Sequence, residues 1–430
     1  MSRILLSAYA CEPGKGSEPE VGWLWATELT DAGHEVWVIT REANRTAIEV
    51  GTAGRLRPRL HFVYYDLPSW SRRWKRGARG VHLYYALWQW GAYRQARRLT
   101  REICFDCVHH VTFVGLRAPS FMGLLGLPFF LGPVSGGEGI PRRLRMGMKP
   151  VAQWRELMRD AANRLIHADP IMRSSFRRAE RIFLATRESL RLVPAAFQQK
   201  CTVQLGIGLS REYLGWTGPK PNSAATELRL LYVGRLLEWK GLDLGIHAVR
   251  RLRDRGVRVR FTIVGDGPAR EGLRQLTAEL GVDEEVHWTA WLPRDQLHES
   301  YYEHDALLFP SLRDSGGMVV LEAMAHGLPV VCTDRGGPAV IVNRRCGRVV
   351  STLEQTKDGV IGGLVEALYE LNCDRTLLRK LGRAARSRAW EFDFYRVAAR
   401  VHPVGREEKG PGLAGVAAAR LEKLPAPTAG

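Results

Sequence analysis

A glycine-rich segment between a short apolar run and a helical pattern offers the clearest chemistry in the chain. The run ends at Pro310, and the segment that follows contains Asp314, Gly316 and Gly317. Glycines let a ligand approach the backbone, and the start of a helix offers free N–H groups. These two features together suit the binding of a diphosphate. Glu322 stands eight residues after the first acid, where a carboxylate can reach hydroxyl groups. An ordinary strand–loop–helix with a solvated aspartate and a capping glutamate is the alternative.

A second loop, between the apolar run 228–233 and a helical pattern over 242–255, carries Arg235 and Lys240. Arginine grips a phosphate through two parallel N–H groups, and lysine places a compact positive charge. Together they can stabilise negative charge that grows on a leaving diphosphate. Basic residues are also common on ordinary surfaces, so this loop gains its meaning from the acids of the first segment.

A third glycine turn follows the apolar run 259–264, at Gly265 and Gly267. It is not a dinucleotide fingerprint, because Arg270 occupies the position of the third glycine. Either the close approach of a ligand or a simple tight turn accounts for these glycines.

These segments resemble the retaining nucleotide-sugar glycosyltransferases of the GT-B fold, most closely glycosyltransferase family 4, which has a Glu-x7-Glu element in this setting. The resemblance implies that Asp314 contacts the donor sugar and Glu322 holds the ribose hydroxyls. It also implies that Arg235 and Lys240 clamp the diphosphate. The aspartate is one methylene shorter than glutamate, so the identity of the sugar stays open. Further donor-binding positions implied by the resemblance are Gly16, Gly234, Gly265, Gly267, Ser315, Gly316, Gly317, Met318 and Val319.

The same resemblance marks two loops of the N-terminal half. One follows the first predicted strand, where the family has a glycine-rich loop near the donor phosphates and the acceptor. The other is the loop over 132–138, which follows a predicted strand over 128–131. The acceptor-side candidates in these loops are Lys15, Ser17, Gly136, Gly137 and Glu138.

Two adjacent histidines end another predicted strand of this half, His109 and His110. The family often has a histidine here that contacts the donor sugar near the reacting carbon. We favour His110 for this catalytic contact. A pair of buried structural histidines is the alternative.

Short apolar runs alternate with helical patterns in both halves of the chain. This predicts the α/β class, with two tandem Rossmann-like, doubly wound domains facing each other across a cleft. An acceptor-binding domain is expected over 1–205, and a nucleotide-sugar-binding domain over 228–375. The Gly- and Pro-rich stretch 206–227 predicts a linker. Helices over 376–401 can cross back to the first domain, and the composition of 402–430 predicts a disordered tail.

Composition limits the partners. Lys and Arg total 63 and Asp and Glu total 45, so the net charge is +18 and an anionic partner is favoured. The seven cysteines are thinly spread, and the Cys104–Cys107 spacing has no second pair, so neither a disulfide framework nor a zinc site is expected. The chain also lacks the Asp-x-Asp pair of metal-dependent transferases. We expect no metal and no cofactor, and the resemblance implies a UDP- or GDP-sugar as the donor substrate.

Two basic stretches indicate where an anionic partner would bind. Nine basic residues and no acid lie between Leu67 and Arg101, interleaved with Trp and Tyr, and 141–181 repeats the bias. An anionic membrane surface suits this pattern. Nucleic acid is not expected, because no recognition motif supports it. The apolar stretches 4–10 and 118–134 are too short or too broken by proline to span a bilayer. We expect a cytoplasmic location, peripheral on the inner face of the cell membrane where the basic surface is used.

The resemblance implies transfer of a hexosyl group to a hydroxyl of a sugar or lipid-linked saccharide, with retention and without a metal. Synthesis of a cell-surface polysaccharide or glycolipid is the expected setting. A nucleotide-sugar epimerase or another GT-B enzyme is the alternative within the fold, and a basic nucleic-acid-binding protein is the alternative of another class. The sequence leaves open the sugar, the base, the acceptor, the linkage and the oligomeric state.

Overall fold

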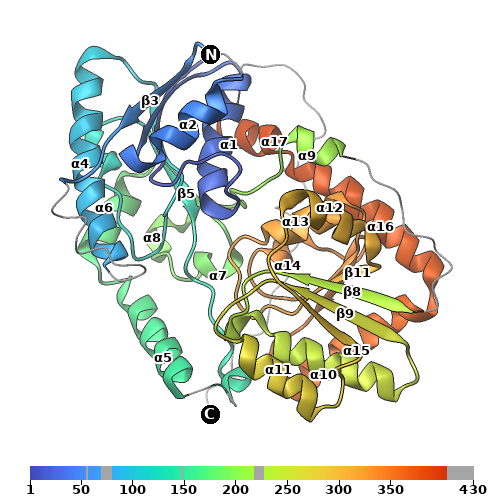
Figure 1. The fold of residues 1–430 in the computed structure, drawn as a ribbon. Helices are drawn as coiled ribbons and strands as arrows, with labels where there is room; N and C mark the ends of the chain where they lie inside the picture. Colours follow the sequence, from blue (N-terminus) through green and yellow to red (C-terminus); the bar gives the residue numbers. More distant parts are fainter. Residues whose placement is uncertain (55–56, 69–79, 147, 149, 217–226, 404–430) are drawn as a thin grey trace.

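Two parallel sheets, one from each half of the chain, organise the protein (Figure 1). The computed structural model describes residues 1–403 except 55–56, 69–79, 147, 149 and 217–226. The first sheet has seven strands in the order β3-β2-β1-β4-β5-β6-β7, and the second has six in the order β10-β9-β8-β11-β12-β13. All neighbouring strands in the described parts of both sheets run parallel. The prediction of two doubly wound α/β domains is confirmed.

The strands of the N-terminal domain are buried on both faces. Along the first strand Ile4 and Leu6 join one core cluster, and Leu5 joins the other, because successive side chains point to opposite faces of a sheet. Such continuous apolar runs are typical of parallel sheets covered by helices on both sides. The strands are β1 (Arg3–Ser7), β2 (Glu35–Thr40), β3 (Leu60–Tyr64), β4 (Cys107–His110), β5 (Phe129–Val134), β6 (Arg181–Leu184) and β7 (Cys201–Val203), which the sequence analysis missed.

Helices cover both faces of this first sheet. Trp88 of α4 lies in the core with no exposed surface. Of the predicted basic stretch, residues 69–79 lie outside the described part of the chain. The helices are α1 (Ser17–Asp31), α2 (Arg45–Thr52), α4 (Val81–Glu102), α5 (Pro150–Leu165), α6 (Pro170–Arg178), α7 (Arg187–Leu190), α8 (Ala195–Gln198) and α9 (Arg211–Gly215).

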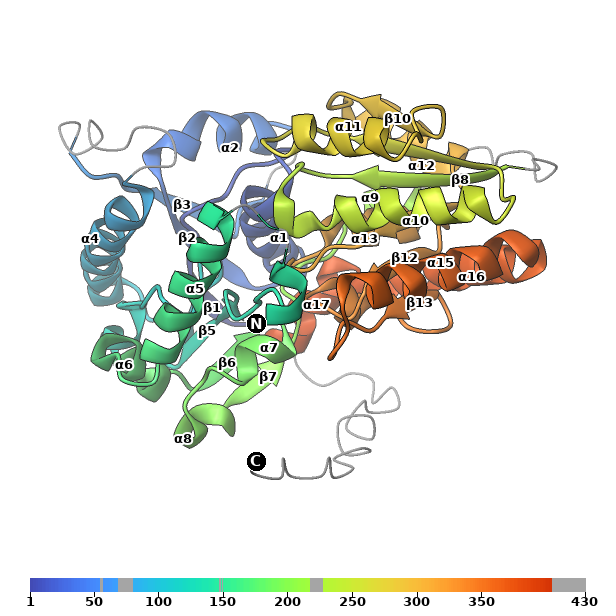
Figure 2. The same cartoon turned by 90° about the horizontal axis from the view of Figure 1, so that it is seen from below.

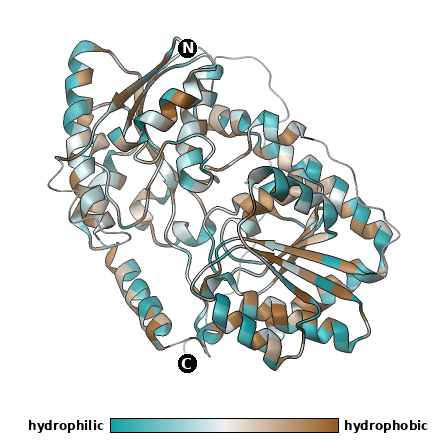
Figure 3. Cartoon of the chain, in the orientation of Figure 1, coloured by the Kyte–Doolittle hydropathy of each residue, from teal (hydrophilic) through white to brown (hydrophobic). Residues whose placement is uncertain are grey.

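The C-terminal domain repeats the pattern with one large core. The strands β8 and β9 begin and end at the bounds of the two apolar runs described above, whereas β13 was not predicted. The strands are β8 (Leu228–Val233), β9 (Val259–Val264), β10 (Val286–Thr289), β11 (Ala306–Phe309), β12 (Val330–Thr333) and β13 (Gly347–Val350). The helices are α10 (Leu242–Asp254), α11 (Arg270–Glu279), α12 (Arg294–Glu303), α13 (Met318–Ala325), α14 (Pro338–Ile341), α15 (Lys357–Cys373) and α16 (Arg375–Ala389). Figure 3 shows that the strands are largely apolar whereas the outer helices carry both kinds of residue.

The last described helix, α17 (Phe394–Val401), returns to the N-terminal domain and packs against α1 (Figure 2). The rings of Phe394 and Trp25 meet edge to face at 5.4 Å between centroids. Gln204 Nε2 donates a hydrogen bond of 3.2 Å to the carbonyl of Val397. The chain therefore crosses between the domains twice. Most of the predicted tail, from residue 404 on, lies outside the described residues.

Candidate active site

The predicted donor loops meet at the point where the strand order of the second sheet reverses. The sheet runs outward in both directions from β8 and β11, so the loops that follow these two strands lie side by side. Leu312 N donates a hydrogen bond of 2.9 Å to Trp239 O, which ties one loop to the other. In doubly wound sheets ligands bind at such a switch point, outside the carboxyl ends of the strands. The fold thus brings together residues some 75 positions apart, as the separation of 74 between Lys240 and Asp314 illustrates.

Lys240 and Asp314 form an ion pair between these loops. Their side chains are 17% and 16% exposed, so the pair is largely but not fully withdrawn from water. Lys240 Nζ also lies 5.2 Å from the centre of the Phe309 ring, within the range of a cation–π contact. The structure therefore places two of the predicted catalytic residues against each other.

The other carboxylate oxygen of Asp314 caps the start of α13. Asp314 Oδ1 accepts hydrogen bonds of 3.0 Å from the N–H groups of both Gly316 and Gly317. The next N–H groups, those of Met318 and Val319, belong to the first turn of the helix, where a backbone donor has no intrahelical acceptor. Together with the positive end of the helix dipole they form a place for an anion.

Glu322 lies in the second turn of α13 and is half-buried. Its Oε2 accepts a hydrogen bond of 2.9 Å from Tyr301 Oη, and burial together with this carboxylate raises the pKa of the phenol well above its usual range. Tyr301 thereby orients one carboxylate oxygen. The sequence analysis missed this tyrosine, since no pattern connects α12 with α13.

The glycines at 265 and 267 are explained by contact between loops. A Cβ at Gly265 would stand 2.0 Å from the carbonyl oxygen of Gly234, and one at Gly267 would stand 2.3 Å from that of Leu236. Gly265 has φ +141°, in the region that favours glycine. These residues therefore press the β9 loop against the β8 loop. Arg235, in the latter, is exposed, and its carbonyl accepts a hydrogen bond of 3.2 Å from Tyr232 Oη. Ser315 is half-buried beside the capped glycines.

Two of the N-terminal candidates serve other contacts. Lys15, exposed in the loop after β1, pairs with Glu12 at 2.8 Å, next to Gly16. Glu138 is only 3% exposed, and its carboxylate accepts hydrogen bonds from Gly136 N at 2.9 Å and Thr186 Oγ1 at 2.7 Å. The expectation that Glu138 meets the acceptor is therefore corrected, since its bonds hold its own loop in shape.

Gly137 belongs to the same tight loop. A Cβ there would stand 2.5 Å from the Cα of Ser189. The glycine thus allows the loop after β5 to pack on α7. Ser17 begins α1 as the first residue after Gly16, and the backbone of Gly16 has φ +66°.

The two histidines are both fully buried, which corrects the expectation that His110 faces a cleft. His110 Nε2 lies 3.0 Å from Tyr85 Oη and 2.9 Å from Gln89 Nε2, inside the N-terminal core. Burial lowers the pKa of His110 to about 4. His109 faces the other side of the sheet, with its Nδ1 3.0 Å from His402 Nε2. This burial favours the alternative of two structural histidines, which the sequence left open.

Arginines and glutamates join the two domains next to the donor loop. Arg313, beside Asp314, pairs with Glu156 of α5, and both side chains are largely buried. Gly336 N donates a hydrogen bond of 3.2 Å to Glu188 Oε1. Burial lowers the pKa of Arg313, and the nearby positive charge of Arg159 lowers it further. These residues were missed, because arginines are too frequent in this chain for any one to stand out.

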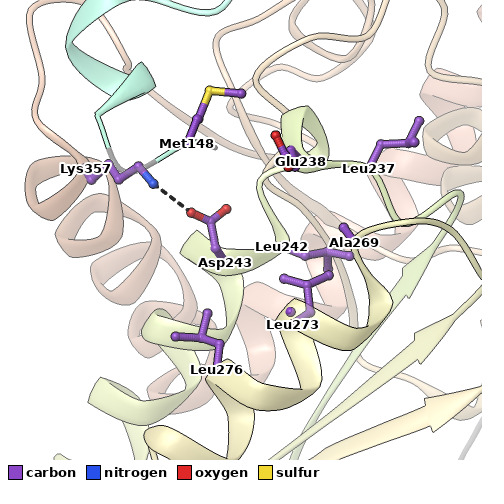
Figure 4. A pocket seen from close by; sticks show the side chains of 10 residues that line it. Met148, Leu237, Glu238, Leu242, Asp243, Ala269, Leu273, Leu276 and Lys357 are labelled. Atoms are coloured by element: carbon purple, nitrogen blue, oxygen red, sulfur yellow. Dashed lines mark hydrogen bonds and ion pairs between the residues drawn. The ribbon is translucent and has the colours of Figure 1, made fainter. Parts of the chain in front are cut away.

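A pocket of about 210 Å³ lies next to this site, at the beginnings of α10 and α11 (Figure 4). Leucines of both helices line it, and Met148 reaches it from the N-terminal domain. Lys357 Nζ and Asp243 Oδ2, 3.0 Å apart, form an ion pair at one side. None of the predicted site residues lines this pocket.

The C-terminal domain resembles a known protein family. Residues 218–388 match the protein family described as Glycosyl transferases group 1. The matched segment contains the Lys240–Asp314 pair, the start of α13 and Glu322.

Curated relatives match over a similar part of the chain. The D-inositol 3-phosphate glycosyltransferase of Streptomyces bingchenggensis (strain BCW-1) is 32% identical over 178 residues, which cover 39% of this chain and 38% of that protein. The putative colanic acid biosynthesis glycosyltransferase WcaL of Escherichia coli (strain K12) is 32% identical over 155 residues, 34% of this chain and 37% of the relative. The chain thus matches under two-fifths of the length of these relatives.

Solved structures match over nearly the whole chain. Anabaena HepE in complex with UDP superposes with a TM-score of 0.60 at 15% identity, covering 93% of this chain and 98% of that one. Sucrose-phosphate synthase from Thermosynechococcus elongatus gives a TM-score of 0.61 at 16% identity, covering 93% and 97%. The two domains of this chain therefore have the two-domain GT-B fold.

Proposed function

We propose that this protein is a retaining glycosyltransferase of family 4 that moves a hexosyl group from a UDP- or GDP-sugar to an acceptor hydroxyl. The observation that carries the proposal is the Lys240–Asp314 ion pair at the start of α13, with Glu322 one turn further on. A cation, free backbone donors and two carboxylates in one place suit a sugar diphosphate. The match of residues 218–388 to group 1 transferases supports the same assignment.

Each residue has a role in this proposal. Arg235 and Lys240 stabilise the charge that develops on the departing diphosphate, the task that a metal ion performs in other transferases. The N–H groups of Met318 and Val319 bind its oxygens. Asp314 contacts the sugar, and Glu322, oriented by Tyr301, holds the ribose hydroxyls.

Retention fits attack on the same face that the diphosphate leaves, with a phosphate oxygen accepting the proton of the acceptor hydroxyl. The C1–O bond to the diphosphate breaks while the C1–O bond to the acceptor forms. No side chain then serves as general base, which agrees with the burial of His110. Arg235 and Lys240 carry the largest electrostatic contribution in this scheme.

The acceptor belongs to the N-terminal domain in this proposal. Two relatives support cell-surface polysaccharide or glycolipid synthesis as the setting. One is named as a putative colanic acid biosynthesis glycosyltransferase, and the other as a phosphatidylinositol monomannoside mannosyltransferase. We propose a cytoplasmic location, with a sugar or lipid-linked saccharide as acceptor. Among the described helices, none has both the length and the apolar composition needed to cross a bilayer.

A panel of nucleotide diphosphates and their sugars tests the proposal by thermal shift. We expect one base to stabilise the protein and Lys240→Ala to abolish the shift. The stabilising sugar nucleotide is then incubated with and without candidate acceptors. Turnover of the donor alone to an epimer would favour the epimerase. Steeply salt-dependent binding to duplex DNA, with no shift for any nucleotide sugar, would favour the nucleic-acid-binding protein.

A further inference from the structure

Helix α5 is amphipathic in the reverse of the usual sense. Large apolar side chains of this helix point to solvent: Val151 is 61% exposed, Trp154 62%, Met158 51% and Leu165 67%. Their spacings of three, four and seven place them along one stripe. Leu157, at 58%, widens the stripe. Figure 1 shows α5 at the outer edge of the N-terminal domain, and Figure 3 shows apolar residues along it.

The polar side chains of α5 point into the protein. Glu156 pairs with Arg313 of the other domain, and Asp160 pairs with Arg145 at 2.8 Å. Arg159 Nη2 donates a hydrogen bond of 3.1 Å to Gly136 O. The helix is thus anchored by its polar face and offers its apolar face outward, whereas a surface helix in water shows the opposite arrangement.

Two more exposed apolar residues flank the helix in the sequence. Met146, before α5, is 66% exposed, and Ile171, in α6, is 52% exposed. Counting these with the five residues of α5, seven of the nineteen strongly exposed large apolar residues of the described chain fall within 146–171. A concentration of this kind marks an interaction surface rather than scattered surface residues.

Positive charge surrounds the stripe. Over 141–181, the exposed charged residues that the structure describes are six arginines and one acid, Glu180. The acids Glu156 and Asp160 are already paired inside. A second copy of this surface would bring arginines against arginines, so self-association is disfavoured. An anionic lipid surface satisfies both the apolar stripe and the cations around it. The exposed arginines are Arg142, Arg143, Arg155, Arg164, Arg177 and Arg178.

We propose that α5 is the element that docks this protein on an anionic membrane surface. The helix has 16 residues, too few to span a bilayer, so it lies in the plane of the interface. Trp154 sits at the level of the headgroups, where indole rings are favoured. The inner face of α5 holds Arg313, next to Asp314, so docking brings the donor site close to the lipid surface.

Vesicle sedimentation of the full chain tests this inference without any nucleotide sugar. We expect binding to vesicles of phosphatidylcholine with phosphatidylglycerol, and much weaker binding to phosphatidylcholine alone. The double variant Trp154→Glu/Met158→Glu should bind the anionic vesicles at least about tenfold more weakly, because it loses apolar burial and adds repelled charge. Val50→Glu, at an apolar position of α2 that is even more exposed, is the control and should bind like the parent.

Two outcomes would overturn the inference. One is equal vesicle binding by the parent and the double variant while both melt at the same temperature. The other is a concentration-dependent dimer in sedimentation equilibrium that the double variant abolishes, without vesicle binding by either protein. Thermal shift by the donor nucleotide, measured on the same samples, reports separately on the proposed transferase site.

Discussion

Lys240 and Asp314 are paired across two loops, and the same aspartate caps the helix that follows it. A lysine side chain has four flexible bonds, and the ion pair restricts them by holding Lys240 Nζ next to the start of α13. Both oxygens of Asp314 are held, one by Lys240 and the other by two backbone N–H groups, so its side chain is fixed in one orientation.

Lys240→Ala is expected to lower kcat/KM for sugar transfer by a factor of roughly a hundred, which corresponds to a loss of about 3 kcal/mol of transition-state stabilisation. The substitution removes the positive charge that stabilises the departing diphosphate in the proposed mechanism. It also leaves Asp314 without its charged partner. Initial rates with the donor found by thermal shift measure the effect. Lys357→Ala is the matched control, since Lys357 forms a comparable ion pair with Asp243 at the pocket outside the site. Full activity of Lys240→Ala would remove this residue from the mechanism.

Glu156→Gln should destabilise the protein by roughly 1–3 kcal/mol, because it leaves the largely buried Arg313 without a charged partner. The loss is expected as a lower midpoint in urea unfolding. Glu366→Gln serves as control, since the Glu366–Arg255 pair is exposed and should contribute little. Equal midpoints for the two variants would mean that the interdomain pair adds no stability.

The free energy of unfolding should fall below about pH 6.5. Burial, with His34 and Arg181 nearby, lowers the pKa of His402 to about 3 from its ordinary value of 6.5. The native protein keeps this imidazole neutral, while the unfolded chain takes up a proton below pH 6.5. Stability is therefore complete above that pH and is lost as the pH falls, by roughly 2 kcal/mol at pH 5 from this group alone.

The contact of His402 Nε2 with His109 Nδ1, at 3.0 Å, joins α17 to the first sheet, and burial also lowers the pKa of His109. His402→Phe should flatten the dependence of melting temperature on pH between 7 and 5. His167→Gln, at an exposed histidine, should leave it unchanged. If the three proteins show the same slope, this histidine pair is not what couples stability to pH.

Gly265→Ala should destabilise the donor domain by at least about 1–3 kcal/mol, because its φ of +141° strains any other residue. The added Cβ would also stand 2.0 Å from Gly234 O and push the two loops apart. Nucleotide affinity should fall together with the melting temperature. Gly362→Ala, in the middle of α15 with open space around its Cβ, should instead stabilise by up to about 1 kcal/mol.

The sequence by itself determined most of the strands, the glycine turns and the residues of the predicted donor loops, although β7 and β13 were not predicted. Each of these is encoded locally: an apolar run of four to six residues such as 228–233 has few other places in a soluble fold than a buried parallel strand. Parallel strands end at the same edge of a sheet, and the resemblance to family 4 then predicted that Lys240 and Asp314 share a site.

Only the tertiary structure decided which side chains meet across long separations and which way a helix faces. Arg313 and Glu156 are 157 residues apart, and His109 and His402 are 293 apart, so no local period connects them. Helix α5 has an ordinary amphipathic sequence, and its periodicity gives the two faces without saying which one turns inward. Arg145 and Arg313 of the neighbouring segments pair with Asp160 and Glu156, so the polar face of α5 packs inward. Buried charges must be paired, whereas apolar side chains can remain exposed.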